Sequence, residues 1–359
     1  MSKENQTKLI SRSPVVVVMG HIDHGKSTLL DYVRKTNVVA GEAGGITQHM
    51  SAYEAEHIGD DGRRHTITFL DTPGHVAFCG IRQRGASAAD VAILIVSAED
   101  GVKPQTVEAL NNIKQAKIPY IVAITKIDKT NANIEKTKQS LGENEIYVEG
   151  WGGDIPCVAI SATTGSGVKE LLDLVILLAE IVDPKTNTDA PASGIIIESA
   201  RHRGKGINAT LIIKNGTLKV GSFICADNAH TPVRYIENFL GKKIDNAQAS
   251  MPISVLGWNI VPKCGSDFIT VNTKKEAEIL VENYIENKKN NENKSATIEK
   301  KKSTVKKNDD MKKDDSDKNI HKITILPIIL KSDTIGSLEG IKNELSKIAQ
   351  DKTQIKIVA

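Results

Sequence analysis

The sequence predicts an α/β domain built on a mostly parallel sheet, followed by a small antiparallel β-barrel and the start of a further α/β domain. Short, almost wholly apolar runs alternate with helical patterns from Val15 to about Val182. This alternation is typical of parallel strands that helices cover on both faces. From about residue 194 the apolar runs become shorter and are separated by closely spaced glycines, as in a small antiparallel barrel. Near the end, a strand, an amphipathic helix and a second strand begin a βαβ unit.

Composition limits the class of protein before any motif is considered. The chain has 359 residues, enough for two or three domains, and a formal net charge of +3, too small to indicate nucleic-acid binding by bulk charge. Its four cysteines are widely separated, which favours reduced thiols and a cytoplasmic location over a disulfide scaffold or a zinc cluster. The polar N-terminus has no signal-peptide core, and no apolar run is long enough to cross a membrane.

Several elements of the first domain can be placed from the sequence. The predicted strands are VVVVM (15–19), HTITFLD (65–71), VAILIVSA (91–98), YIVAITKID (120–128) and PCVAISA (156–162). The predicted helices are KSTLLDYVRKT (26–36), PQTVEALNNIKQA (104–116) and GVKELLDLVILLAEI (167–181). An additional strand over 49–58 is expected to pair with the run from residue 63 through a hairpin turn at GDDG (59–62).

Changes in composition predict the domain boundaries. The strands expected in the barrel are GIIIESA (194–200), NATLIIK (208–214), GTLKVGSFICA (216–226), TPVRYIEN (231–238) and PISVLGW (252–258). We expect a disordered tail over 1–13, the α/β domain over 14–182, a linker over 183–193, the barrel over 194–275, a charged low-complexity linker over 276–322 and an incomplete βαβ domain over 323–359.

Two basic segments could contact nucleic acid. Order is expected to fail from about Glu282 to Lys322, because this stretch is highly charged and has almost no apolar residues. Its lysines could form a nucleic-acid arm, but the aspartates among them favour a solvated linker. The turn ESARHRGKG (198–206) gathers Arg201, His202, Arg203 and Lys205. It could equally contact RNA phosphates or be a solvated hairpin tip.

The stretch GHIDHGKST (20–28) matches the phosphate-binding pattern GxxxxGK[ST] in its required context, after a strand and at the start of a helix. Glycines let the backbone N–H groups fold around phosphate oxygens, and the positive end of the helix lies behind them. Lys26 would contact the β- and γ-phosphates, and the Ser27 hydroxyl would bind Mg²⁺. A metal site at His21 and His24 is not expected, because no third ligand lies near them in the sequence.

Three later turns complete a predicted nucleotide site. In DTPGH (71–75), Asp71 could hold Mg²⁺ through water, Gly74 could approach a γ-phosphate, and His75 could position an attacking water. In TKID (125–128), Asp128 could accept both the ring N–H and the exocyclic amine of guanine, a donor pair that adenine lacks. SAT (161–163) would add backbone N–H groups to the base pocket. The predicted nucleotide-binding residues are Gly20, His21, Ile22, Asp23, His24, Gly25, Lys26, Ser27, Thr28, Asp71, Thr72, Pro73, Gly74, Thr125, Lys126, Ile127, Asp128, Ser161, Ala162 and Thr163.

Together these motifs resemble the translational GTPases, and AGEAGGITQHMSAYE (40–54) is similar to the first switch of bacterial translation initiation factor two. The stretch from Asp71 to Thr106 is similar to that family almost throughout, and the resemblance covers roughly residues 14–268 before it returns weakly at ILKSDTIGSLEGIKNEL (329–345). It implies that Gly45, Ile46 and Thr47 form a switch in which Thr47 joins Ser27 and Asp71 around Mg²⁺. It also implies that His75 is catalytic, that Ile22 and Ile46 gate it, and that Asp23 is a candidate ligand for a monovalent cation.

The resemblance further implies a monomeric, ribosome-stimulated GTPase that cycles between GTP and GDP. Its partners would be the small ribosomal subunit and the joining large subunit, and its switching would promote initiator tRNA placement and subunit joining. The family's tRNA-binding module has no counterpart here, so the chain is expected to be truncated at its C-terminus, and tRNA contact is expected only if a further domain exists. Two alternatives stay open: a nucleotide-gated ribosome-binding module or non-initiating translational GTPase, and a P-loop kinase or ATPase.

One position departs from the family pattern. The family has asparagine where this chain has Thr125. The asparagine amide bridges the guanine edge and the phosphate loop, whereas threonine is shorter and offers only a hydroxyl. We therefore expect weaker base affinity, with discrimination kept by Asp128.

Overall fold

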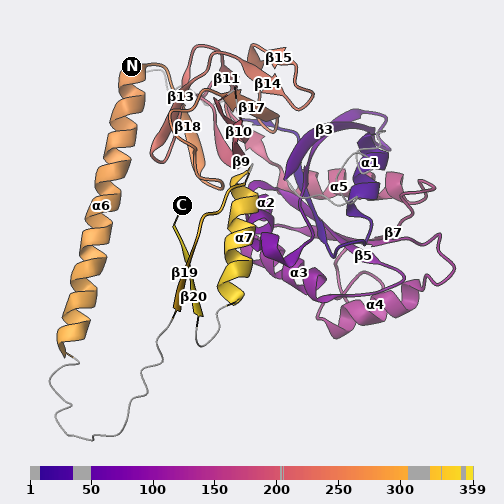
Figure 1. The fold of residues 1–359 in the computed structure, drawn as a ribbon. Helices are drawn as coiled ribbons and strands as arrows, with labels where there is room; N and C mark the ends of the chain where they lie inside the picture. The colour runs from indigo at the N-terminus through magenta and orange to yellow at the C-terminus, as the bar shows by residue number, and fades with distance from the viewer. Residues whose placement is uncertain are drawn as a thin grey trace, which may run out of the picture.

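The computed structural model describes residues 9–34, 50–202, 204, 206–305, 324–332, 334–348 and 353–358. Figure 1 shows an α/β domain, a β domain above and beside it, one long helix that projects away from both, and a C-terminal strand–helix–strand unit. The fold class predicted from the sequence is confirmed.

The first domain contains a six-stranded sheet in the order β3-β4-β2-β5-β6-β7. Only the β3–β4 pair is antiparallel, and it forms the hairpin expected at GDDG. The strands are β2 (Val15–Gly20), β3 (Ser51–Ile58), β4 (Arg64–Asp71), β5 (Val91–Ser97), β6 (Tyr120–Thr125) and β7 (Cys157–Ala159). The helices are α1 (Lys26–Arg34), the 3₁₀ turn η3 (Val76–Phe78), α2 (Cys79–Ala88), α3 (Pro104–Ala116), α4 (Ile134–Glu143) and α5 (Val168–Val182).

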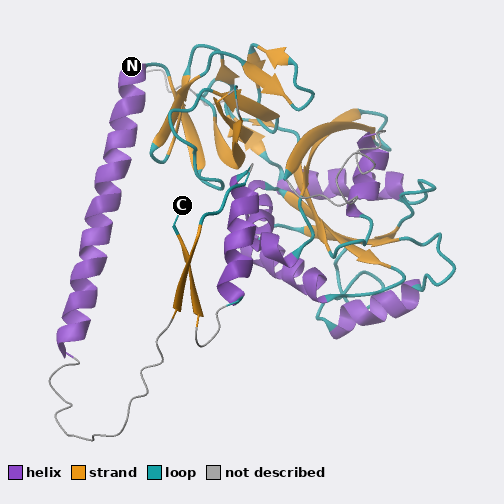
Figure 2. Cartoon of the chain, viewed as in Figure 1, coloured by secondary structure: helices purple, strands orange, loops and turns teal. Residues whose placement is uncertain are grey.

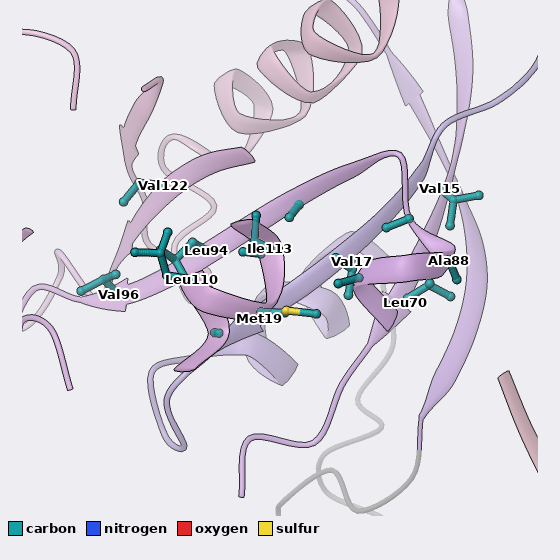
Figure 3. Packing of buried hydrophobic residues seen from close by; sticks show 14 of the residues in the cluster. Val15, Val17, Met19, Leu70, Ala88, Leu94, Val96, Leu110, Ile113 and Val122 are labelled. Carbon is teal, nitrogen blue, oxygen red and sulfur yellow. The ribbon is translucent and has the colours of Figure 1, made fainter. Parts of the chain in front are cut away.

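Helices cover both faces of this sheet, and successive residues of β2 point alternately to the two sides. Val15, Val17 and Met19 pack in the cluster that includes α2 and α3 (Figure 3), whereas Val16 and Val18 pack in the cluster that includes α1 and α5. All six residues of β2 are buried. This explains the continuous apolar run in the sequence, since a strand with helices on both faces has no solvent-facing side.

Two helices of this domain were not predicted. In α2 two glycines interrupt the pattern of CGIRQRGASA, and in α4 most of IEKTKQSLGE is polar. Only Thr137 and Leu141 of α4 are buried, so its sequence carries almost no helical apolar period. Packing against the sheet stabilises both helices where the local signal is weak.

The second domain is β structure, drawn as orange strands in Figure 2. Eight of its strands form an antiparallel sheet in the order β13-β12-β18-β9-β10-β17-β14-β15. Its strands, with the small pair β11–β16, are β9 (Ser193–His202), β10 (Gly206–Asn215), β11 (Leu218–Lys219), β12 (Phe223–Ala226), β13 (Ala229–Pro232), β14 (Ile236–Asn238), β15 (Lys243–Ile244), β16 (Asn246–Ala247), β17 (Pro252–Leu256) and β18 (Asp267–Val271). The turn ESARHRGKG forms the β9–β10 hairpin, although Arg203 and Lys205 lie outside the described residues.

The N-terminal tail and the first linker are more ordered than expected. β1 (Ile10–Ser11) pairs with β8 (Lys185–Thr186), so part of the predicted tail and part of the predicted linker form a small sheet. Arg12 holds both carboxylate oxygens of Asp90 at 2.7 and 2.8 Å, and Lys214 of the second domain lies 2.8 Å from the same group. Burial favours a raised Asp90 pKa, but these two cations outweigh it and lower the pKa. This network ties the chain start and both domains together.

The charged segment also differs from the expectation of disorder. Helix α6 extends from Lys274 to Val305, and the remainder of that segment, up to residue 323, lies outside the described residues. Ala277 and Val281 are buried where the helix starts against β12, β13 and β18. The first turns are therefore fixed by packing, and the lysines and glutamates that follow them in the charged run are compatible with helix.

The C-terminal unit places a helix on the first domain. β19 (Thr324–Ile328) and β20 (Thr353–Ile357) pair in parallel on either side of α7 (Ile335–Lys347), as the βαβ prediction requires. Helix α7 packs against η3, α2 and β9 (Figure 1). Arg84 of α2 and Glu339 of α7 form an ion pair at 2.6 Å.

Candidate nucleotide-binding site

The predicted phosphate loop joins the end of β2 to the start of α1 and depends on two glycines. A Cβ on Gly20 would collide with the carbonyl oxygen of Ile95, because β2 and β5 are adjacent there. Gly25 has φ +91°, a conformation that side chains disfavour. The loop therefore turns sharply at the end of β2, and its backbone leads directly into the N-terminus of α1.

Lys26 is buried at the centre of this loop. Its Nζ donates to the carbonyl oxygens of Gly20 at 3.1 Å and His21 at 2.5 Å. Burial lowers the pKa of Lys26 to about 8, although nearby Asp71 favours the charged form. A Cβ on Gly74 would lie 2.7 Å from Nζ, so the Pro-Gly turn reaches the amine only because residue 74 has no side chain. Phosphate loop and DTPGH turn thus meet at Lys26.

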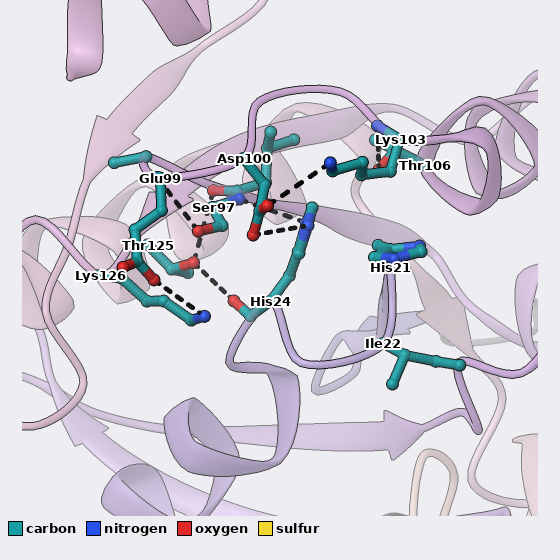
Figure 4. A network of polar contacts seen from close by, with 12 residues as sticks. His21, Ile22, His24, Ser97, Glu99, Asp100, Lys103, Thr106, Thr125 and Lys126 are labelled. Carbon is teal, nitrogen blue, oxygen red and sulfur yellow. Dashed lines mark hydrogen bonds and ion pairs between the residues drawn. The ribbon is translucent and has the colours of Figure 1, made fainter. Parts of the chain in front are cut away.

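His24 braces the loop from inside the protein. Its side chain is 1% exposed, and Nδ1 accepts a hydrogen bond from the Ser97 N–H at 3.2 Å (Figure 4). Burial lowers the pKa of His24 to about 4, so the neutral ring that this contact requires dominates near neutral pH. The backbone carbonyl of His24 accepts a hydrogen bond from the Thr125 hydroxyl at 2.5 Å. Thr125 therefore makes a direct contact with the phosphate loop.

The predicted base-recognition loops line the same cavity as the start of α1. Asp128 is exposed, and the neighbouring Ser161 hydroxyl lowers its carboxyl pKa. Lys126 has φ +61°, and its Nζ lies 3.1 Å from a carboxylate oxygen of Glu99. Ser161 is buried and uses its hydroxyl oxygen to accept the Thr164 N–H at 3.2 Å, which shapes the SAT turn.

The DTPGH turn is held by a side chain that the sequence did not single out. Buried Arg82 donates to the carbonyl oxygens of Pro73 at 3.0 Å and His75 at 2.6 Å, and it pairs with Glu108 at 2.5 Å. The Thr72 hydroxyl donates to the Val18 carbonyl at 2.9 Å, so this side chain joins the turn to β2. The His75 ring is exposed, and its Nδ1 accepts the Ala77 N–H at 3.1 Å.

A cavity of about 800 Å³ lies where these loops meet. The predicted site residues that line it are Ile22, Asp23, Gly25, Lys26, Ser27, Thr28, Gly74, His75, Thr125, Lys126, Asp128, Ala162 and Thr163. Eight further lining residues complete the wall: Ala77, Phe78, Lys129, Ser337, Gly340, Ile341, Glu344 and Leu345, of which the last five belong to α7. Four turns spread over residues 20–163 therefore line one cavity together with the C-terminal helix.

The remaining predicted residues surround this cavity without lining it. They are Gly20, His21, His24, Asp71, Thr72, Pro73, Ile127 and Ser161, and several of them shape the loops as described above. Gly45, Ile46 and Thr47 lie outside the described residues. The Mg²⁺ prediction can be examined only for Ser27, which lines the cavity, and Asp71, which is buried at the end of β4 near Lys26. These hard oxygen donors fit the chemistry of Mg²⁺.

Three comparisons place the chain among known proteins. Residues 11–180 match the model of the elongation factor Tu GTP binding domain, and residues 191–271 match elongation factor G domain 2. Residues 296–359 match the model of translation-initiation factor 2. Translation initiation factor IF-2 from Dehalococcoides mccartyi is 44% identical over 99% of this chain, and that from Pelotomaculum thermopropionicum is 43% identical over 99%. The chain belongs to the translation initiation factor IF-2 family.

The match covers only part of each IF-2 relative. The chain spans 57% of the Dehalococcoides protein and 35% of the Pelotomaculum protein. Among solved structures, GDP-bound aIF5B from Aeropyrum pernix is 26% identical with a TM-score of 0.58, covering 94% of this chain and 62% of that one. The apo form of elongation factor SelB from Methanococcus maripaludis is 27% identical with a TM-score of 0.54, covering 74% and 57%.

In this IF-2 family member, the sequence motifs did not identify the residues outside the four turns that hold these turns in place. The Gln105 side-chain oxygen, on α3, accepts a hydrogen bond from the Ile22 N–H at 2.9 Å and so fixes the phosphate loop at Ile22. Arg82 fixes the DTPGH turn, and α7 supplies one wall of the cavity. No sequence signal marks these contacts, because each joins residues that tertiary packing alone brings together. No helix in the described part of the chain is long and apolar enough to span a membrane, and the same part holds no cluster of His, Cys, Asp and Glu suited to a metal ion.

Proposed function

We propose that the first domain binds GTP with Mg²⁺ and hydrolyses it to GDP and phosphate. The observation that carries the proposal is the shared cavity of the phosphate loop, the DTPGH turn, the TKID loop and the SAT turn. A triphosphate at Gly25–Thr28 would have its γ-end near Gly74 and His75 and its base near Asp128. A P-loop kinase or ATPase does not recognise guanine and would not need all four of these turns at one site.

Purine choice would depend on Asp128. Its lowered pKa keeps the carboxylate ionised, and an ionised carboxylate can accept two hydrogen bonds from the guanine N1–H and amine. Ala162 and Thr163 line the same part of the cavity and would offer backbone N–H groups to the base. Adenine presents no such donor pair, so it would leave the carboxylate unsatisfied.

The phosphates would be held by Lys26 and the backbone around it. On binding, the Lys26 ammonium would exchange the loop carbonyls for phosphate oxygens, which also favour its charged form. Ser27 and Thr47 would hold Mg²⁺ directly and Asp71 through water. Bound Mg²⁺ supplies charge neutralisation on the β- and γ-phosphates. Asp23, which lines the cavity, would be the ligand for a monovalent cation.

His75 would orient the attacking water. Because Nδ1 accepts the Ala77 N–H, a neutral ring carries its proton on Nε2. That Nε2–H can donate a hydrogen bond to water, which suits a positioning role better than proton abstraction. Ile22 lines the cavity beside the turn and would form the apolar gate with Ile46, so hydrolysis should be slow until the ribosome moves His75 inward.

At the level of the whole factor, we infer a monomeric translation initiation factor that acts in the cytoplasm on the small ribosomal subunit and the joining large subunit. The switch residues 45–47 and Gly74 would hold the γ-phosphate and relax after hydrolysis. This change would promote initiator tRNA placement and subunit joining, with tRNA contact made by a part of the factor outside this chain. The proposal is supported by the 44% identity to an IF-2 protein.

The decisive experiment is a substitution at Asp128 that should change which purine base the site prefers. Asp128→Asn replaces a carboxylate acceptor by an amide whose NH₂ can donate a hydrogen bond. The affinity for GTP should therefore fall at least about tenfold. The affinity for xanthosine triphosphate should rise, because this nucleotide carries a carbonyl in place of the guanine amine. Calorimetry with GTP, xanthosine triphosphate and ATP measures all three. Unchanged purine choice, or wild-type protein that prefers ATP, would refute the proposal.

Ribosome dependence needs its own measurement. Multiple-turnover phosphate release should be slow for the chain alone and faster with 70S ribosomes, and His75→Ala should remove the stimulated rate while GTP affinity is kept. Equal rates with and without ribosomes would contradict gating. Ribosome binding that depends on GTP but never leads to hydrolysis would favour the alternative of a nucleotide-gated binding module.

A further inference from the structure

Helix α5 is apolar on two sides, although only one of them packs on the sheet. Val168, Leu171, Leu172, Val175 and Ala179 are buried in the cluster on the α1 side of the sheet. On the opposite side Leu177 is 54% exposed and Ile181 is 75% exposed, four residues apart and therefore one turn apart. A surface helix normally carries polar residues on its outer face. The outer stripe of α5 is thus unexplained by the fold itself.

This stripe borders a groove of about 680 Å³ between α5 and the β3–β4 turn. The apolar lining comes from Leu174, Ile176 and Leu177 of α5. The opposite wall is formed by Gly59, Asp60 and Asp61 of the turn, with His65 below them. The groove shares no lining residue with the nucleotide cavity, so the two are separate sites.

A hydrogen bond and an ion pair link the walls of the groove. His57 of β3 lies 2.7 Å from Asp173 of α5, with both side chains mostly buried. Lys169 lies 2.6 Å from Asp60 across the opening. The turn is therefore fixed to the helix on both sides of the groove, which favours a preformed surface.

The rim carries a strong negative charge. Five carboxylates line the groove, namely Asp60, Asp61, Glu170, Asp173 and Glu180. They are offset by two cations, since Lys169 pairs with Asp60 and Arg63 of the turn lies 3.8 Å from Asp61. Such a surface repels nucleic-acid phosphates and anionic lipid headgroups. A symmetric pair of copies joined here would place carboxylates against carboxylates. An apolar floor with an acidic rim is complementary to an amphipathic helix whose polar edges carry lysine or arginine.

We propose that the groove between α5 and the β3–β4 turn is a docking site for a basic amphipathic helix of a protein partner. Leucine or isoleucine side chains of that helix would pack on Leu174, Leu177 and Ile181. Its lysines or arginines would face Glu170 and Glu180, which lie on the same helix and line the groove. The inference does not depend on GTP binding, since none of these residues belongs to the nucleotide cavity.

A designed peptide provides the probe. It is a fluorescent, leucine- and lysine-containing amphipathic helix roughly 18 residues long, or about five turns. Fluorescence anisotropy measures its binding to the full chain, alongside a counterpart in which every lysine is glutamate. Wild-type protein should bind the basic peptide and not the acidic one, and added salt should weaken the interaction.

The variants separate specific docking from general attraction to acidic protein. Leu177→Gln with Ile181→Gln should lower affinity for the basic peptide at least about tenfold, because it removes the apolar contacts without changing charge. The matched control is Leu240→Gln, a 62% exposed leucine on the β14–β15 hairpin, which should leave affinity unchanged. Glu170→Lys with Glu180→Lys should lose the basic peptide and gain the acidic one. Circular dichroism and GTP affinity confirm that each variant is folded.

Three outcomes would overturn the proposal. Equal peptide binding by wild type and the Leu177→Gln, Ile181→Gln variant would mean that the stripe is not a docking surface. A wild-type dimer in sedimentation velocity that this variant dissociates would assign the stripe to a second copy of the chain. Binding to phosphatidylserine vesicles that this variant loses would assign it to a membrane surface.

Discussion

The Thr125 hydroxyl lies 2.5 Å from the backbone carbonyl oxygen of His24, so the last residue of β6 donates a hydrogen bond into the phosphate loop. The same hydroxyl lies 3.4 Å from the Val96 carbonyl. Threonine thus links the base-recognition strand to the phosphate loop, a link that in the family pattern an asparagine amide makes. The shorter side chain reaches the loop because β6 ends directly beside it, as Figure 4 shows.

Thr125→Val should uncouple these two loops. Valine matches the shape of threonine but leaves the buried His24 carbonyl without its donor, which costs about 1–3 kcal/mol. We expect a lower melting temperature and GTP affinity weakened by up to about tenfold. Differential scanning calorimetry and nucleotide titration measure the two effects, and Thr125→Ser, which keeps the hydroxyl, serves as the control. Equal GTP affinity for the valine and serine variants would show that the contact has no effect on the site.

Arg82→Met should disorder the DTPGH turn. The guanidinium holds the Pro73 and His75 carbonyls and pairs with Glu108, so its removal leaves two acceptors and one carboxylate without a partner. Breaking a mostly buried pair in this way costs about 3–5 kcal/mol. Urea unfolding should show the loss, and ribosome-stimulated phosphate release should fall more than GDP affinity, because GDP lacks the γ-phosphate near His75.

Glu108→Gln separates the two roles of Arg82. It removes the ion pair but keeps a hydrogen-bond acceptor, so the turn should stay in place and phosphate release should stay near the wild-type rate. A rate as low as that of Arg82→Met would show that the ion pair, and not the contact with the turn carbonyls, positions His75.

Stability should fall in acid because of His24. Burial lowers its folded-state pKa to about 4, below the ordinary value of 6.5, so the unfolded chain binds a proton that the folded protein resists. The stabilisation by neutral His24 is therefore complete above about pH 6.5 and is lost as pH falls toward 4, by about 3 kcal/mol in total. Urea unfolding between pH 7.5 and 4.5 measures it. In His24→Gln the dependence should be flatter, since glutamine can accept the Ser97 N–H without titrating; identical slopes would contradict the assignment.

Gly340→Ala should loosen α7 from the first domain. A Cβ there would lie 2.9 Å from the Phe78 ring, and Phe78 belongs to the turn that directly follows His75. We expect faster amide hydrogen exchange in α7 and a lower melting temperature. Gly142→Ala is the matched control, because α4 leaves open space around that glycine and alanine should stabilise the helix by about 0.5–1 kcal/mol. Unchanged exchange in Gly340→Ala would mean that the contact with Phe78 does not fix α7.

The sequence by itself determined the elements whose signals are local. The run at 15–20 is apolar on every residue because helices cover both faces of β2, and glycine, lysine and serine at 25–27 follow from what a phosphate loop must do. Helix α3 begins and ends at the predicted residues, because proline and a regular apolar period mark it. Where the local pattern is polar or interrupted, as in α2, α4 and α6, the sequence favoured loop or disorder and packing made a helix.

Only the tertiary structure decided which distant residues support the site. Arg82 on the DTPGH turn, Gln105 on the phosphate loop, Arg12 on Asp90 and the wall supplied by α7 all join segments far apart in the chain. A sequence pattern records the conformation of its own segment, whereas these hydrogen bonds and ion pairs exist because folding brings separate segments within about 3 Å of one another.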